Sequence, residues 1–161
     1  MEEKQSILKF MIIEHGILYN LLVGFRFQSS SAQNPQAALR NFSKFKEKLT
    51  PHHFAEESII FKMDNKITTV PIIKVLKKEH TLIEKIVEKI DQNIANNEDA
   101  EENAANLQRL LRNHLNLEEK RFYPLLDKQL NDKEKEELIQ KVLSITQPKK
   151  GILQKLGSLF G

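Results

Sequence analysis

Two stretches of the chain, residues 53–57 (HFAEE) and 114–118 (HLNLE), each begin with a histidine and end with a glutamate. In an α-helix, side chains four residues apart project from the same face, so each stretch directs an imidazole and a carboxylate toward one point. Two further histidines, His15 and His80, each follow a glutamate and are 65 residues apart, while the two stretches are 61 residues apart. These nearly equal separations indicate an internal repeat of two helix pairs related by a pseudo-twofold axis.

The composition is typical of a single, all-helical domain. The chain has 161 residues, 40% hydrophobic and 29% charged, which is enough for one core. It has only five glycines and five prolines, so few turns are expected. Because there is no cysteine, disulfides and thiolate metal sites are excluded, and any metal would be bound by His, Asp or Glu. The net charge of +3 is spread over interleaved Lys and Glu, which argues against nucleic-acid binding.

Apolar residues recur every three or four positions in four long segments, the pattern of amphipathic helices. The segments are 6–27, one that begins at Pro35, 72–94, and one that begins after residue 99 and continues to about residue 122. Pro51 predicts a kink or short break within the second segment, and Pro124 predicts a bend after the fourth. Four long helices with short connections predict an antiparallel up-down four-helix bundle.

Three regions are expected along the chain: the bundle over residues 1–130, a short additional helix within 131–147, and an amphipathic tail over 148–161. The apolar residues of the tail would share one helical face. The tail is therefore predicted to dock on the bundle itself, on a partner or on a membrane surface. The acidic N-terminus and the lack of a long uninterrupted apolar run predict a cytoplasmic location.

Each long helix is predicted to carry one histidine within its apolar stripe. On the 72–94 helix, Glu84 also follows His80 by four residues. Four imidazoles and two bridging carboxylates would fill most of the roughly twelve positions of two octahedral ions, which favours iron or manganese over tetrahedral zinc. The alternative, a metal-free core, would leave several buried polar groups unpaired at about 1–3 kcal/mol each. The predicted ligands are His15, His53, Glu57, His80, Glu84, His114 and Glu118.

One ligand pair is ambiguous, because His52 and Glu56 have the same spacing as His53 and Glu57. We favour the second pair because a phenylalanine lies eight residues after its histidine, as in the C-terminal stretch, and because Phe54 follows His53 as it does in the hemerythrin-like family that the chain resembles. His52 is then predicted to lie outside the ligand set, as an outer or surface residue.

The ordered set of histidines and glutamates resembles the hemerythrin-like family, specifically its HHE cation-binding domains, over about residues 7–126. The resemblance also rests on the strings HFAEE at 53–57 and EEKRFYP at 118–124. It implies a non-haem di-iron site with an oxo or hydroxo bridge, in which Glu57 and Glu118 bridge the two irons and the histidines are terminal ligands.

The chain departs from the oxygen-carrying members of that family. Glu84 stands where those carriers have a second histidine, and Glu118 and Glu119 stand near the place of a bridging aspartate. The chain looks more like the branch that senses or handles oxygen, peroxide, nitric oxide or iron, with Tyr19 as a candidate hydrogen-bonding neighbour of the site. The sequence leaves open whether the protein is an enzyme.

The expected function is therefore to bind, sense or react with oxygen, peroxide or nitric oxide. The alternative is an interaction or sensory module with a structural metal, in which the tail engages a partner or a membrane. Ferritin-like di-iron enzymes are disfavoured, because they use Glu-x-x-His and none of the five histidines here has a glutamate three residues before it.

Overall fold

The computed structural model describes residues 5–30, 34–63 and 69–148, and these contain helices and no strand. The α-helices are α1 (Ile7–Ser30), α2 (Pro35–Ala55), α3 (Phe61–Met63), α4 (Val70–Ala95), α5 (Glu101–Leu117), α6 (Tyr123–Gln129) and α7 (Asp132–Thr146). Two π-helical turns interrupt them: η1 (Glu56–Ile60) joins α2 to α3, and η2 (Glu118–Phe122) joins α5 to α6.

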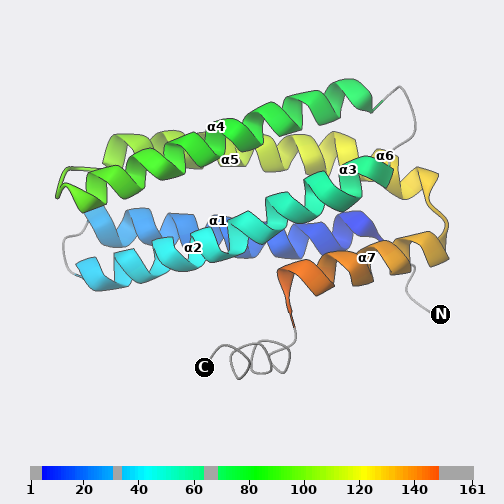
Figure 1. Cartoon of the computed structure of the whole chain (residues 1–161), viewed down its shortest axis with the longest axis horizontal. Helices are drawn as coiled ribbons and strands as arrows, with labels where there is room; N and C mark the ends of the chain where they lie inside the picture. The colour runs from blue at the N-terminus through cyan, green and yellow to red at the C-terminus, as the bar shows by residue number, and fades with distance from the viewer. Residues whose placement is uncertain (1–4, 31–33, 64–68, 149–161) are drawn as a thin grey trace, which may run out of the picture.

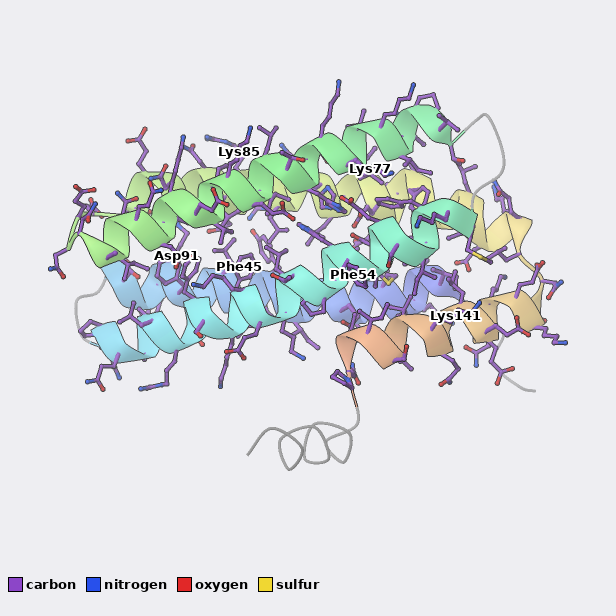
Figure 2. All side chains as sticks on the ribbon, in the orientation of Figure 1. Phe45, Phe54, Lys77, Lys85, Asp91 and Lys141 are labelled. Atoms are coloured by element: carbon purple, nitrogen blue, oxygen red, sulfur yellow. The ribbon has the colours of Figure 1, made fainter. Side chains whose placement is uncertain are left out.

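The four long helices form the predicted all-α, up-down bundle. α1 and α2 run antiparallel as one pair, α4 and α5 form the second pair, and α7 lies along the outside of the first (Figure 1). The closest helix packing joins α1 to α2, α4 to α5 and α1 to α5, and α7 packs against α2 and η1. Side chains from all four long helices fill the space between the two pairs (Figure 2).

Local sequence signals explain where several helices begin. The side chain of Asn34 accepts a hydrogen bond from the backbone N–H of Ala37 at 3.0 Å, and Pro35 occupies the first turn of α2. α7 begins with a capping box between Asn131 and Glu134. These contacts satisfy backbone donors that a helix terminus would otherwise leave unpaired.

The core consists of two apolar clusters with a polar layer between them. One cluster includes Leu18, Phe42 and Phe45, and the other, on the α7 side, includes Met11 and Tyr123. Along α1, His15 lies between the last residue of one cluster and the first of the other. The buried histidines of α2 and α4 likewise lie between members of the two clusters, and on α5 His114 lies in the last turns before the second cluster begins at Phe122, so the buried histidines form one layer across the bundle.

Some expectations about the helices are corrected. α2 runs through Pro51 without a break, and the irregularity comes later, at the π-helical turn η1. Pro124 lies in the first turn of α6, directly after the π-helical turn η2, so it falls where the type of helix changes. The predicted tail lies outside the described residues from position 149 onward.

Among the described helices, α1 alone is long and apolar enough to cross a membrane, with a mean hydropathy of 1.4. The interrupted apolar run in the sequence predicts instead that no segment is long and apolar enough to cross a membrane. Core helices of soluble proteins satisfy the same criterion, and α1 buries His15 and a stripe of apolar residues against the other helices.

Asp127 fastens the start of α1 to α6. Its carboxylate accepts hydrogen bonds from the backbone N–H groups of Ile7 at 2.8 Å and Leu8 at 3.1 Å, and from the Ser6 hydroxyl at 2.8 Å. The contact acts as an N-cap supplied from a distant part of the chain.

We expect Asp127→Ala to lower the free energy of unfolding by about 1–2 kcal/mol, because three donors lose their acceptor. Urea unfolding followed by circular dichroism measures the change. Asp127→Asn, which keeps one acceptor oxygen, is the matched control and should cost less. Equal stability of all three proteins would contradict this role.

Candidate metal centre

Every long helix contributes at least one fully buried histidine to the middle of the bundle, and two glutamates are buried with them. The exposed fraction of each of these side chains is 4% or less: His15, His52, His53, Glu56, His80, His114 and Glu118. Burial of so many ionisable groups is costly unless they are paired with one another or bind a metal.

The buried groups form two sets of four donors, and both sets contain Glu56 and Glu118. His15 and His52 complete the first set, and His80 and His114 complete the second; all donor atoms of a set lie within 4.8 Å of one another. Each set thus consists of one histidine pair from one half of the repeat together with the two shared carboxylates.

Each shared carboxylate presents one oxygen to each set. Glu118 places Oε2 3.2 Å from His15 Nε2 and Oε1 3.2 Å from His114 Nε2. Glu56 places Oε1 3.3 Å from His52 Nε2 and Oε2 3.1 Å from His80 Nε2. These separations would suit a cation held between a carboxylate oxygen and an imidazole nitrogen, because two ligands at right angles on one ion, each about 2.0–2.2 Å from it, are about 3 Å apart.

The free lone pairs in the cluster fit a metal. Within the described part of the chain, Nε2 of all four histidines and both oxygens of Glu118 are buried without a hydrogen-bond partner. Three of these rings are held from the other side: Nδ1 of His15 bonds Glu119, Nδ1 of His80 bonds Glu57 and Nδ1 of His114 bonds Glu79, at 2.8, 2.7 and 2.9 Å. A carboxylate on Nδ1 fixes the proton there and leaves the lone pair of Nε2 pointing inward, as in metal-binding histidines.

The structure places Glu56, rather than the predicted Glu57, inside the cluster. Glu57 is 43% exposed and reaches the site only through Nδ1 of His80. His52, predicted to be an outer residue, is 2% exposed and faces Glu56. Phe54, which decided the predicted register, lies on the surface at 59% exposure.

Another feature of the sequence predicts that Glu56 and His52, rather than Glu57 and His53, are the pair in the cluster. Aligning the two Glu-Glu pairs by their first members matches Glu56 with Glu118, and then His52 matches His114. The positions of the two π-helical turns agree with this alignment, because each turn begins at the first glutamate of its pair. π-helical turns are often found at functional sites.

His53 is an additional member of the site on one side. Its ring stacks on that of His80, with centroids 3.8 Å apart and planes at 14°, and its donors fall within one group with His80 and His114. Glu84, the last predicted ligand, is 60% exposed and lies 3.7 Å from His53 Nδ1, outside both four-donor sets.

Burial and mutual pairing shift the ionisation of the cluster. Burial lowers the pKa of His15 and His114, but the negative charge of Glu118, together with the hydrogen bonds that their Nδ1 atoms make with Glu119 and Glu79, outweighs it and raises the pKa values to about 9 and about 10. Burial raises the pKa of Glu56, but His52 and His80 outweigh it and hold that pKa well below its ordinary value. Without metal, His15 and His114 are therefore protonated beside the buried carboxylates, whereas burial and the neighbouring His80 hold the pKa of His53 well below its ordinary value. Metal ions compete with protons for the imidazoles.

The two halves of the site differ in their surroundings. The Tyr123 hydroxyl donates a hydrogen bond to Glu56 Oε1 at 2.5 Å, and burial raises the pKa of this tyrosine well above its ordinary value. The corresponding residue of the other half is Phe61, which stacks near His80 and offers no hydroxyl. Tyr19, the tyrosine singled out in the sequence, instead accepts a hydrogen bond from Gln108 at 3.0 Å.

The fold and this cluster define a four-helix-bundle protein with a buried histidine and carboxylate site for metal cations. The chain belongs to the hemerythrin family: the model of the hemerythrin HHE cation binding domain matches residues 7–126. Neither a curated protein nor a solved structure matches the chain significantly. The matched residues include all four long helices and every residue of the two four-donor sets.

Replacement of the two adjacent glutamates tests which of them is a ligand. We expect Glu56→Gln to lose most of the bound metal, because Glu56 offers an oxygen to each set. Glu57→Gln is the matched control and should keep its metal with affinity reduced about 10- to 100-fold, the usual effect of a residue that supports a ligand. Metal content after dialysis, measured by atomic emission, gives the answer. A site emptied by Glu57→Gln and intact in Glu56→Gln would restore the register predicted from the sequence.

Proposed function

We propose that the protein holds two iron ions in this site and uses them to bind, sense or react with oxygen, peroxide or nitric oxide in the cytoplasm. The observation that carries the proposal is the arrangement of Glu56 and Glu118, each with one oxygen toward either histidine pair. A single ion would need only one oxygen of each. Two ions, one beside each histidine pair, would use all four carboxylate oxygens of Glu56 and Glu118.

The donor set favours iron. It consists of nitrogen and oxygen only, with five imidazoles and two carboxylates. Manganese prefers a site richer in oxygen, and zinc prefers fewer ligands per ion. Five imidazole nitrogens and four carboxylate oxygens do not fill the roughly twelve positions of two octahedral ions, so room is left for a small exogenous ligand.

The residues around the site have separate tasks. Iron, when bound, supplies the redox chemistry. Glu57, Glu79 and Glu119 orient the imidazoles, and the two apolar clusters on either side keep bulk water away. Tyr123 donates its hydroxyl proton to Glu56 and so provides a hydrogen-bond donor at one of the shared carboxylates.

Protein isolated from iron-supplemented cells is expected to contain about two irons per chain. Its optical spectrum should change on addition of oxygen to the reduced protein, or of peroxide or nitric oxide. Glu118→Ala, which removes a shared carboxylate, is the control that should lose both iron and response. An iron-loaded protein whose spectrum responds to none of these molecules would exclude the proposed reactivity and leave a structural metal site.

A separate observation concerns the predicted docking of the tail, for which the bundle itself, a partner and a membrane were the candidates. α1 exposes large apolar residues, among them Ile13 at 66% and Phe27 at 73%. At the end of α7, Gln147 donates a hydrogen bond to Glu14 of α1 at 3.0 Å, so the chain beyond residue 148 begins beside this face. We infer that the tail docks on the exposed apolar face of α1.

Truncation after Pro148 should leave the metal content unchanged, because the ligands all precede Glu119. It should increase the binding of a hydrophobic dye, because the exposed apolar face of α1 would be uncovered. Full-length protein with Leu156→Asp and Phe160→Asp should behave like the truncated form. Unchanged dye binding would exclude docking on α1. Sedimentation of the full chain with anionic lipid vesicles would then identify a membrane as the target instead.

A further inference from the structure

A pocket of about 480 Å³ opens between α2 and α4 directly beside the buried cluster. Its wall includes His53, which also belongs to the metal-binding group with His80 and His114. α2 and α4 are not among the closely packed helix pairs, so this seam of the bundle is looser than those between α1 and α2 or α4 and α5. The pocket therefore joins solvent to one side of the cluster.

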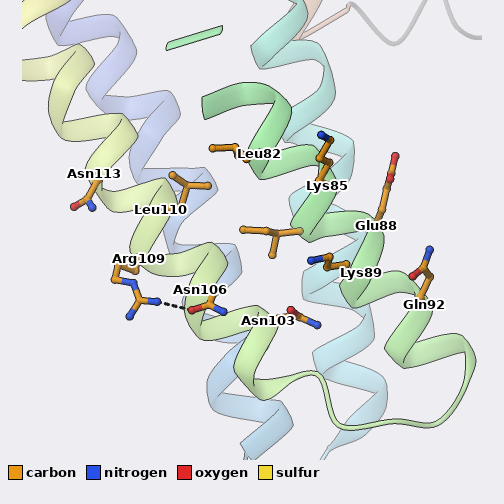
Figure 3. Close-up of a pocket in the computed structure, with 11 residues that line it drawn as sticks. Leu82, Lys85, Glu88, Lys89, Gln92, Asn103, Asn106, Arg109, Leu110 and Asn113 are labelled. Carbon is orange, nitrogen blue, oxygen red and sulfur yellow. Dashed lines mark hydrogen bonds between the residues drawn. The ribbon is translucent and has the colours of Figure 1, made fainter. Parts of the chain in front are cut away.

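A larger cavity lies elsewhere and does not reach the site. It has a volume of about 680 Å³, lies between α4 and α5, and is lined by basic and amide side chains such as Lys85, Lys89, Asn106 and Arg109 (Figure 3). None of its lining residues belongs to the cluster. The larger cavity is therefore not the one that connects solvent to the buried cluster.

His53 is the residue that makes the smaller pocket a candidate binding site. The side chain is 4% exposed, and neither ring nitrogen has a hydrogen-bond partner among the described residues. Its Nδ1 faces Glu84 Oε1 at 3.7 Å, too far for a hydrogen bond. The His80 ring next to it, by contrast, is held by a carboxylate on Nδ1. An imidazole with two free nitrogens at the border of pocket and cluster can accept a ligand from the pocket side.

The charge around the pocket selects for cations. Two carboxylates, those of Glu57 and Glu84, line it, and Lys62 is the only cation among its described lining residues. Glu84 is exposed and free to meet a hydrated ion, whereas Glu57 already accepts a hydrogen bond from His80. A neutral molecule such as oxygen would not require this charge, whereas a divalent cation would be attracted by it.

We propose that this pocket is the entry port for the divalent cations that load the metal centre, with Glu84 and His53 as the pair that takes an ion from water and passes it to the His80 and His114 side. The inference rests on the proposed metal centre and adds its route of filling. The carboxylate of Glu84 provides the first contact. The imidazole of His53, stacked on His80, provides the next donor inward.

The rate of metal uptake tests the port separately from the site. Full-length protein stripped of metal by a chelator is mixed with Co²⁺ in a stopped-flow instrument, and the visible absorption of bound Co²⁺ is followed. We expect Glu84→Gln to slow uptake about three- to tenfold, because one attracting charge is lost at the mouth. The final absorbance should be unchanged, since Glu84 lies outside both four-donor sets.

Two further variants supply the controls. Glu88→Gln, one turn further along α4, makes the same change of charge beside the larger cavity and should leave the rate unaltered. Lys62→Gln removes the cation at the port and should speed uptake. Equal rates in Glu84→Gln and unsubstituted protein, or equal slowing by Glu88→Gln, would overturn the port while leaving the centre intact. Failure of the unsubstituted protein to bind Co²⁺ would overturn both.

Discussion

The structure depends on a layer of buried imidazoles and carboxylates that crosses the bundle between two apolar clusters. Glu56 and Glu118 lie at its middle, each facing a histidine of both helix pairs. In a metal-free protein, imidazolium and carboxylate charges must stabilise one another there, since unpaired buried charge is strongly unfavourable. Metal ions would replace those protons and supply the positive charge that two buried carboxylates require. Stability and metal binding are therefore linked through the same seven side chains.

The π-helical turns position both kinds of carboxylate. Each turn begins with a glutamate that points into the layer, and the glutamate that follows it reaches across to a histidine of the opposite helix pair. Glu57 bonds His80 in this way, and Glu119 bonds His15. Each Glu-Glu pair thus supplies one central carboxylate and one that orients an imidazole, and it also fastens the two helix pairs together at the level of the site.

The internal repeat is broken at several places around this symmetric layer. Tyr123 donates a hydrogen bond to Glu56, whereas the matching Phe61 cannot. His53 and the port lie on one side only. Glu79 orients His114, but its counterpart Glu14 accepts a hydrogen bond from Gln147, the residue after α7, instead. Two ions bound here would occupy different environments, and a small ligand would meet one of them first.

The sequence by itself determined the helical class and the bundle and predicted four residues of the two four-donor sets, because helical periodicity and four-residue spacing are local properties of the chain. His15, His80, His114 and Glu118 could be assigned from the apolar stripes in which they lie. The choice between Glu56 and Glu57 could not, because each follows a histidine by four residues, and because aligning the two halves of the repeat by histidine or by Glu-Glu pair gives different answers. Only the tertiary structure decided it, since the π-helical turn and the contact of Glu57 with His80 depend on how the second helix pair packs against the first.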